Sequence, residues 1–204
     1  MIKVIGFDLD NTLYNQELFE FEVFDSISEV VSENFNIDKI KYTKELKDLY
    51  KCGQKEYVFD KAMMSICGHL PILWDDFVKE HILGIYRNFM PKQLHTFDNI
   101  INNLTSLQNR GYHLFLITNG NSTIQNNKID VLNIRKYFDL ILISDDYEPT
   151  RRKPDIYMFN KAIDYFNVDP SEMIYIGDDL VRDKASELVD INFIHISEFD
   201  FNFL

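Results

Sequence analysis

Several residue types are scarce in this sequence of 204 residues, and each shortage excludes a class of protein. The only cysteines are Cys52 and Cys67, which have neither Cys-x-x-Cys spacing nor a companion cluster of histidines. Such thiols indicate neither a zinc site nor a disulfide framework. With five prolines and seven glycines, the sequence shows no proline-rich linker, low-complexity tract or internal repeat. We therefore expect a reduced chain without a repeat architecture.

Positive charge is also scarce, because 21 Lys and Arg face 33 Asp and Glu, for a net charge of −12. The sequence lacks the broad positive field of non-specific nucleic-acid binders, and no Lys/Arg-rich stripe restores it locally. No stretch reaches the length of a membrane span, and the apolar start, 1–7, is too short for a signal peptide. We expect a cytoplasmic protein with neither a nucleic-acid polymer nor a membrane as partner.

Apolar side chains make up 46% of the sequence, enough for one packed domain or for a core domain that carries a smaller insert. Short apolar runs, most of them followed at once by polar residues or glycine, have the pattern of buried parallel strands. These runs are Lys3–Phe7, Tyr112–Ile117, Leu140–Ile143, Met173–Ile176 and Phe193–Ile196. Segments with helical apolar spacing lie between the later runs: Phe97–Asn109, Ile124–Leu132 and Ile156–Phe166. This alternation predicts an α/β fold with a doubly wound parallel sheet.

The connection after the first strand is unusually long. The 104 residues 8–111 separate the first strand from the second, far more than a crossover helix needs. From Gln16 to Arg87, apolar residues recur at helical spacing. We therefore expect an all-helical cap domain, residues 15–90, inserted into an α/β core domain formed by residues 1–14 and 91–204.

Polar residues that can take part in catalysis or ligand binding follow four of the expected strands. In an open α/β sheet, ligands bind at the carboxyl ends of the strands, so these are the positions to inspect. The strand-end residues are Asp8, Asp10, Thr118, Asn119, Lys153, Asp178 and Asp183. Each group alone has an ordinary explanation, such as an acidic turn, a solvated basic loop or a helix start that favours acids. Their joint occurrence in this order, each at a strand end, favours a catalytic site.

This set of motifs resembles that of the haloacid dehalogenase superfamily of phosphohydrolases. The resemblance covers nearly the whole core and implies a Rossmann-like fold, and the insert resembles the family's helical type-one cap by its position. The Phe7–Leu13 start and the Ile117–Gly120 stretch are most similar to the subgroup that contains pyrimidine 5′-nucleotidases and sugar-phosphate phosphatases. The resemblance therefore implies a phosphatase that acts on a nucleotide or a sugar phosphate.

The resemblance also assigns catalytic roles. Asp8 is expected to attack phosphorus and form an aspartyl-phosphate, while Asp10 protonates the leaving oxygen and later activates water as a base. Thr118, the backbone amide of Asn119 and Lys153 are expected to bind the transferring phosphoryl group. An aspartate at position 10 favours phosphate esters, because an alkoxide leaving group needs a proton.

A metal ion is expected as well, because a carboxylate nucleophile and a phosphate dianion repel each other unless a cation joins them. Asp8 and Asp178 form a hard oxygen site that suits Mg2+. By resemblance, the backbone carbonyl of Asp10 is the third protein ligand. Asp183 is expected either to bind the metal directly or to contact the residues that bind it.

Other functions remain open at this stage. A phosphomutase of the same superfamily transfers the phosphoryl group to a sugar hydroxyl instead of water. A phospho-accepting binding module of the response-regulator type uses similar residues without turnover, but in a different order along the chain and without a large helical insert. We expect a small phosphorylated metabolite as partner and take a monomer as the default state, with a dimer left open.

Overall fold

The computed structural model describes residues 1–201, and the chain divides into two compact units. The first unit combines Met1–Gln16 with the chain from Leu94 onward, and it contains the sheet. The second unit, Glu17–Gln93, is helical. The role of 15–90 as a cap stays a prediction.

The sheet of the first unit has the strand order β3-β2-β1-β4-β5, and every neighbouring pair is parallel. The strands are β1 Val4–Phe7, β2 His113–Thr118, β3 Leu140–Ile143, β4 Met173–Gly177 and β5 Asn192–His195. This order confirms the predicted doubly wound α/β sheet. The chain runs from β1 outward to β3 and then returns to β4 on the other side of β1, so β1 and β4 flank the topological switch point.

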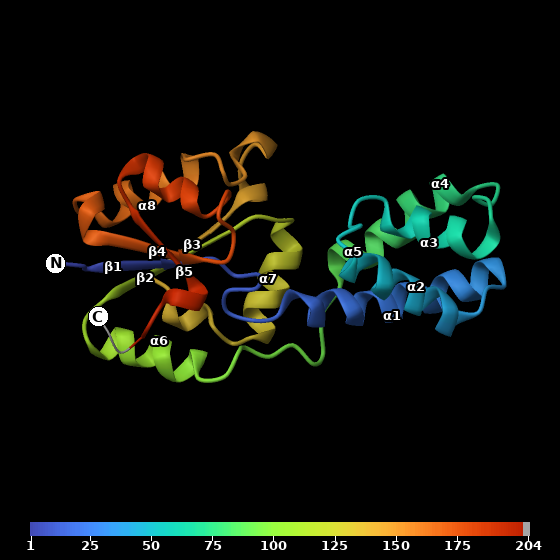
Figure 1. Ribbon diagram of the computed structural model, residues 1–204, viewed down its shortest axis with the longest axis horizontal. Helices are drawn as coiled ribbons and strands as arrows, with labels where there is room; N and C mark the ends of the chain where they lie inside the picture. Colours follow the sequence, from blue (N-terminus) through green and yellow to red (C-terminus); the bar gives the residue numbers. More distant parts are fainter. Residues whose placement is uncertain (202–204) are drawn as a thin grey trace. The chain divides into compact units, whose positions relative to one another are not determined.

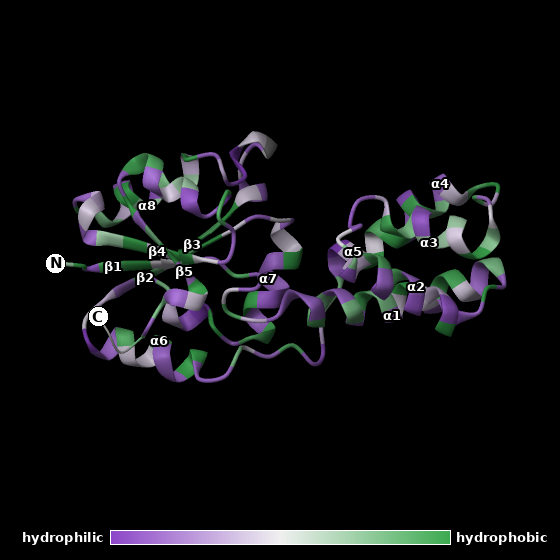
Figure 2. Cartoon of the chain, in the orientation of Figure 1, coloured by the Kyte–Doolittle hydropathy of each residue, from purple (hydrophilic) through white to green (hydrophobic). Residues whose placement is uncertain are grey.

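The central strands are apolar because helices cover both faces of the sheet, which leaves no face for water. Every residue of β1 and β4 is buried, and the strands appear green in Figure 2. The helices of this unit are α6 Ile100–Asn109, α7 Ser122–Val131 and α8 Tyr157–Phe166. Figure 1 shows α6 and α8 on opposite faces of the sheet.

The face under α8 forms one hydrophobic cluster. Met158, Phe159 and Ala162 of α8 are fully buried there, together with Phe115 of β2 and Tyr175 of β4. The ring of Tyr175 meets Phe159 edge-on, with ring centroids 4.9 Å apart. This packing fixes β4, which is followed directly by Asp178.

The strand register brings the predicted site residues to one edge. Phe7 pairs with Leu116 of β2 and with Ile176 of β4, and the backbone N–H of Asp8 donates to the carbonyl of Ile176 at 2.9 Å. The residues that directly follow these strands therefore emerge side by side, as the sequence pattern predicted.

The second unit consists of helices with short breaks, as predicted from its apolar spacing. Its helices are α1 Gln16–Phe35, α2 Lys39–Lys51, α3 Val58–Cys67, α4 Trp74–Phe77 and α5 Leu83–Asn88. A π-helical turn, Val78–Ile82, lies between α4 and α5. Helix α1 begins at Gln16, which is the last residue of the range Met1–Gln16 in the first unit. Its interior is aromatic: Trp74 is almost fully buried, and its indole N–H donates to Asp60 at 2.7 Å. None of the helices in residues 1–201 is long and apolar enough to cross a membrane.

The aromatic C-terminal segment packs on the sheet. The ring of Phe201 stacks on Phe7 of β1 with centroids 6.2 Å apart, and Phe199 meets Phe7 edge-on at 6.4 Å. The last aromatic residue of this segment, Phe203, lies outside the described residues.

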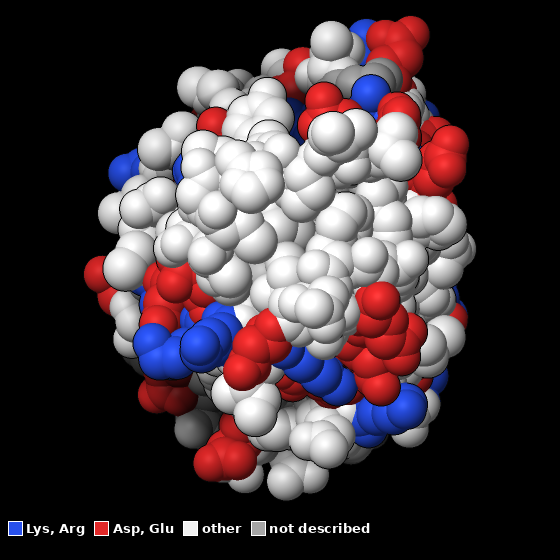
Figure 3. Space-filling model, turned by 90° about the vertical axis from the view of Figure 1, so that its right-hand side faces the viewer, with Lys and Arg blue, Asp and Glu red and all other residues white. Residues whose placement is uncertain are grey.

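On the face shown in Figure 3, blue and red side chains lie beside one another in a band, next to a broad uncharged area.

Candidate active site

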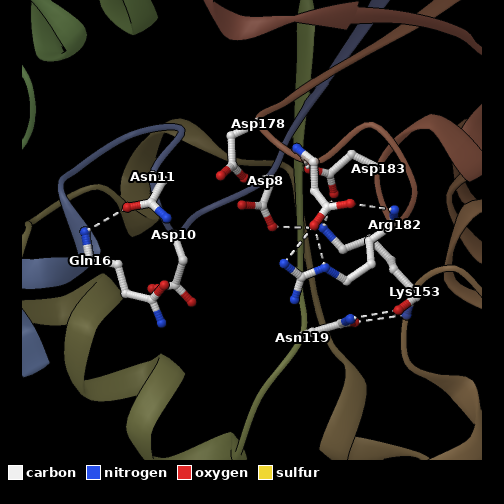
Figure 4. Close-up of a pocket in the computed structure, with 10 residues that line it drawn as sticks. Asp8, Asp10, Asn11, Gln16, Asn119, Lys153, Asp178, Arg182 and Asp183 are labelled. Carbon is white, nitrogen blue, oxygen red and sulfur yellow. Dashed lines mark hydrogen bonds and ion pairs between the residues drawn. The ribbon is translucent and has the colours of Figure 1, made fainter. Parts of the chain in front are cut away.

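A polar pocket lies at the carboxyl edge of the sheet, beside the switch point. It encloses about 100 Å³. Its walls are formed by Asp8, Asp10, Asn11, Gln16, Asn119, Lys153, Asp178, Asp179, Arg182 and Asp183 (Figure 4). Six of the seven predicted strand-end residues therefore meet in one pocket, and Thr118 is the exception.

Three carboxylates form an acidic cluster, which we define as Asp8, Asp178 and Asp183. One oxygen from each lies within 4.8 Å of the others, and Figure 4 shows the three side chains turned toward a common space. Asp8 and Asp183 are buried, and Asp178 is partly exposed. Carboxylates this close repel one another strongly unless cations compensate their charge.

Lys153 provides part of this compensation. Its Nζ donates to Asp8 Oδ1 and to Asp183 Oδ1, each at 2.6 Å, and its side chain is only 3% exposed. It also contacts the Tyr175 hydroxyl at 2.9 Å and the Ile117 carbonyl at 3.1 Å. One buried ammonium group thus bridges two of the three carboxylates.

The pKa values of Asp8 and Asp178 are both raised, and burial is the largest cause of each shift. Burial, opposed by Lys153 and reinforced by Asp183 and Asp10, raises the pKa of Asp8 to about 7. Burial and the nearby charges of Asp183 and Asp179 also raise the pKa of Asp178. Burial would lower the pKa of Lys153, but its two carboxylate partners outweigh burial and raise it. One lysine does not balance the acidic cluster.

The residues of the cluster fit a divalent metal. Mg2+ prefers a few carboxylate oxygens and keeps several positions for water or substrate oxygens. The acidic cluster offers such oxygens at the rim of a polar cavity, and its remaining negative charge is the charge that a cation would neutralise. Asp183 belongs to this group, and the ligand role of the Asp10 carbonyl stays a prediction.

The loop after β4 holds its carboxylates by local backbone contacts. Asp183 Oδ2 accepts from the backbone N–H of Asp179 at 3.0 Å, and Asp179 in turn pairs with Arg182 at 2.6 Å. Gly177 is required here, because a Cβ at this position would collide with the carboxylate of Asp183. The Gly-Asp-Asp turn is therefore shaped to bring Asp183 back against the strand end.

Asp10 sits in a different environment, which we call the Asp10 socket and define as Tyr14, Gln125 and Lys128. Lys128 Nζ lies 2.8 Å from Asp10 Oδ1, Gln125 Nε2 donates to Asp10 Oδ2 at 3.0 Å, and the Tyr14 hydroxyl donates to Asp10 Oδ1. Burial alone would raise the pKa of Asp10, but Lys128 and the three hydrogen bonds lower it. Asp10 is thus held as a paired carboxylate.

Asn119 and Thr118 both form hydrogen bonds with other residues of the protein. Asn119 exchanges two hydrogen bonds of 2.8 Å with the backbone of Lys153, and so it ties the loops after β2 and β3 together. Thr118 is fully buried, does not line the pocket, and accepts from Gln125 Nε2 at 2.5 Å. Their direct contacts with a phosphoryl group stay predictions.

The sequence pattern misses several residues of the site. Gln125 and Lys128 are three apart on α7, a spacing that places them on one helix face, but nothing in the sequence says which strand end that face meets. Tyr175 looks like one more apolar strand residue, although its hydroxyl lies against Lys153. These residues need the three-dimensional arrangement to be found.

The fold and the pocket together define a class: α/β proteins that bind a small ligand at the carboxyl ends of their strands, beside the switch point. Residues 5–196 match the model of the haloacid dehalogenase-like hydrolase family. The chain belongs to this family, as the motifs predicted.

Comparison with curated proteins identifies relatives along most of the chain. A glyceraldehyde 3-phosphate phosphatase of Pyrococcus abyssi is 32% identical over 186 residues, which are 90% of this chain and 76% of that protein. A phosphoglycolate phosphatase of Aquifex aeolicus is 24% identical over 185 residues, 87% of this chain and 76% of that protein. The prediction of an enzyme of the phosphoric monoester hydrolase class is confirmed.

The fold is similar to that of solved members of the family. A haloacid dehalogenase superfamily hydrolase from Geobacter sulfurreducens superposes with a TM-score of 0.72 at 17% identity, covering 95% of this chain and 86% of that one. At this identity the likeness shows the fold alone.

Proposed function

We propose that this protein is a Mg2+-dependent phosphatase that hydrolyses a small sugar phosphate or a similar phosphate monoester through an aspartyl-phosphate on Asp8. The observation that carries the proposal is the pair of opposed aspartate environments at the end of β1. Asp8 belongs to a metal-type acidic cluster, whereas Asp10, two residues on, is held apart by the Asp10 socket. Two carboxylates with separate surroundings can divide nucleophilic and acid–base work.

In the first step, an Asp8 oxygen attacks phosphorus and the bond from phosphorus to the ester oxygen breaks. The electron pair of that bond goes to the ester oxygen, which takes a proton from Asp10 and leaves as an alcohol. Asp10 must therefore be protonated in the complex that reacts. The product of this step is phosphorylated Asp8 with an ionised Asp10.

In the second step, water attacks the same phosphorus atom and gives its proton to Asp10. The bond from phosphorus to Asp8 breaks, which releases inorganic phosphate and restores both aspartates. The ionised Asp10 that the socket favours is the form required at this point. Lys153, held between Asp8 and Asp183, stays in place to offset charge near the nucleophile throughout.

A Mg2+ ion held by Asp8, Asp178 and Asp183 would supply the positive charge that lets a dianionic phosphate approach Asp8. The protein contributes the arrangement of these carboxylates, since Lys153 and the backbone of Asp179 fix Asp183.

The relatives support the choice of substrate class. The relatives described above are phosphatases of glyceraldehyde 3-phosphate and of phosphoglycolate, both small phosphate esters. The pocket of about 100 Å³ is well below the ~300–1,000 Å³ of sites for drug-sized ligands. It has room for a phosphoryl group, and the preference for a short sugar-type phosphate over a nucleotide rests on the relatives.

The test is phosphate release from a panel of esters: glyceraldehyde 3-phosphate, phosphoglycolate, a hexose phosphate, nucleoside monophosphates and an aryl phosphate, each with Mg2+ and with a chelator. We expect Mg2+-dependent release that is fastest for the short esters. Asp8→Asn is expected to lower kcat by at least ~10⁴-fold, because the nucleophile is lost.

Asp145→Asn is the matched control, because Asp145 lies just beyond the edge strand β3, pairs with the Arg152 side chain and does not line the pocket. It should retain activity. Release that persists in Asp8→Asn would contradict the proposal. Transfer of the phosphoryl group to a sugar hydroxyl instead of water would replace the phosphatase by a phosphomutase.

A further inference from the structure

Lys128 is a buried cation that the chemistry described above does not use directly. It lies on α7 with a side chain only 3% exposed, and its ammonium group is 2.8 Å from Asp10 Oδ1. Removing an ammonium group from water costs several kcal/mol unless an opposite charge compensates. A buried lysine aimed at the predicted acid–base carboxylate therefore points to a role connected with that carboxylate.

Two further donors complete the contact around Asp10. Gln125, also on α7 and buried, donates to Asp10 Oδ2 at 3.0 Å, so that Lys128 and Gln125 hold different oxygens of one carboxylate. The Tyr14 hydroxyl, from the loop that follows β1, donates to Oδ1. A carboxylate with donors on both oxygens cannot rotate about its Cβ–Cγ bond without breaking these hydrogen bonds.

Gln125 also links Asp10 to the predicted phosphate-binding residue. Its Nε2 carries two hydrogens, and the second is directed to Thr118 Oγ1 at 2.5 Å. Because Thr118 Oγ accepts this bond, its own hydrogen can point in another direction and donate. One amide group thus sets the orientation of both Asp10 and the Thr118 hydroxyl.

The loop before α7 is built to admit Gln125. Gly120 has φ of +151°, and a Cβ there would lie 3.0 Å from the Gln125 side chain. A side chain at position 120 would push against the amide group that contacts Asp10. The glycine of the Thr-Asn-Gly motif therefore has a packing role toward the Asp10 socket in addition to its turn conformation.

We propose that Lys128, Gln125 and Tyr14 are positioning residues that hold the Asp10 carboxylate in line with the leaving-group oxygen. This inference rests on the proposed function, because it concerns the acid–base step of the same reaction. The three residues act through Asp10 and do not touch the reacting atoms. Their loss frees the Asp10 carboxylate to rotate, and although it also removes contacts that lower the pKa of Asp10, the lost orientation should slow proton donation to the leaving group more than attack by Asp8.

The leaving group separates these two effects. An alkyl phosphate such as glycerol phosphate releases an alkoxide that needs the proton from Asp10, whereas dinitrophenyl phosphate releases a stable phenolate that does not. The ratio kcat/KM covers the steps up to departure of the leaving group, so slow hydrolysis of phosphorylated Asp8 does not obscure the comparison. Both esters are measured with Mg2+ in the full-length protein.

For Lys128→Met we expect kcat/KM to fall ~100-fold on glycerol phosphate and less than ~3-fold on dinitrophenyl phosphate. Lys128→Arg keeps a donor and a positive charge and should recover at least ~10-fold of the loss on the alkyl ester. Lys136→Met, at an exposed position beyond α7, is the matched control and should leave both values unchanged.

Tyr14→Phe provides a second test that keeps the buried ring and removes one oxygen, so it applies even if Lys128→Met does not fold. We expect the same selectivity for the alkyl ester, with a loss of ~5–10-fold. Equal losses on both esters in the folded variants, or no loss on either, would overturn the inference and leave the proposed function intact. Release from neither ester by the wild-type protein would overturn the proposed function and the inference with it.

Discussion

Two aspartates separated by one residue occupy opposite electrostatic environments in this protein. In the acidic cluster, burial and neighbouring carboxylates raise the pKa of Asp8 to about 7. In the Asp10 socket, one buried lysine faces one carboxylate, and the pKa of Asp10 is lowered despite burial. The cluster has more negative charge than its lysine can balance, whereas the socket is paired one to one.

The chemical role of each aspartate in this motif therefore depends on the residues that the fold places next to it. The two aspartates come from one turn after β1, but their partners come from different places. The partners of Asp8 come from the loops after β3 and β4, and two of those of Asp10 come from α7. Variants that change each set of neighbours separately test whether the two environments differ in this way.

The largest effect on stability is expected from Lys153→Met. This change leaves the Asp8 and Asp183 carboxylates buried without their shared ammonium group, which should lower the free energy of unfolding by about 3–5 kcal/mol. The parallel change in the socket, Lys128→Met, leaves Asp10 with two other donors and should cost about 1–3 kcal/mol. Urea unfolding in the presence of a chelator measures both, and a larger cost for Lys128→Met would contradict the contrast.

The pH dependence of stability is the next largest effect. Because the folded chain raises the pKa of Asp8 to about 7, it holds that proton more tightly than the unfolded chain, so the contribution of Asp8 to stability falls as pH rises from ~4 to ~7. The lowered pKa of Asp10 gives the opposite sign: its contribution is present at neutral pH and is lost as pH falls below ~4.

Asp8→Asn isolates the first of these contributions. Relative to the wild type without divalent metal, the variant should gain about 1 kcal/mol or more between pH ~5 and pH ~8. Urea unfolding at the two pH values measures this, with Asp145→Asn as control. An unchanged difference between variant and wild type at both pH values would show that Asp8 is not perturbed as described.

The smallest effect is expected from Tyr175→Phe. The change removes a hydroxyl that contacts Lys153 Nζ at 2.9 Å and donates to the Ile117 carbonyl at 2.9 Å, while the ring keeps its packing against Phe159. We expect a loss of about 1 kcal/mol in the free energy of unfolding, measured by urea denaturation. A gain in stability would mean that this hydroxyl does not support Lys153.

The sequence predicted most of the framework because parallel strands and their ends leave strong local signals. Continuous apolar runs marked all five strands, and the segments between them marked α6, α7 and α8. Helix ends were less predictable: α6 begins at Ile100, three residues after the predicted start, because Asn99 adopts a positive φ of 62°. Such a turn depends on the local backbone and not on apolar spacing.

The residues of the candidate site were predictable where they follow strands, and unpredictable where their position depends on packing between elements. Asp8, Lys153 and Asp178 follow strands and could be read in order along the chain. The contact of Lys128 with Asp10 joins residues 118 positions apart, and no periodicity specifies it. The burial of Thr118 behind Gln125 was also not visible, because a strand-end threonine can face either the pocket or the interior.

The most direct test of the central claim is chemical trapping of the intermediate. The protein is incubated with Mg2+ and a short phosphate ester, quenched in acid, treated with borohydride to reduce any acyl phosphate, and digested for mass spectrometry. The account predicts that the reduced residue is Asp8 and that Asp10, Asp178 and Asp183 are unmodified. Modification at another residue, or turnover of the ester with no trapped Asp8, would contradict it.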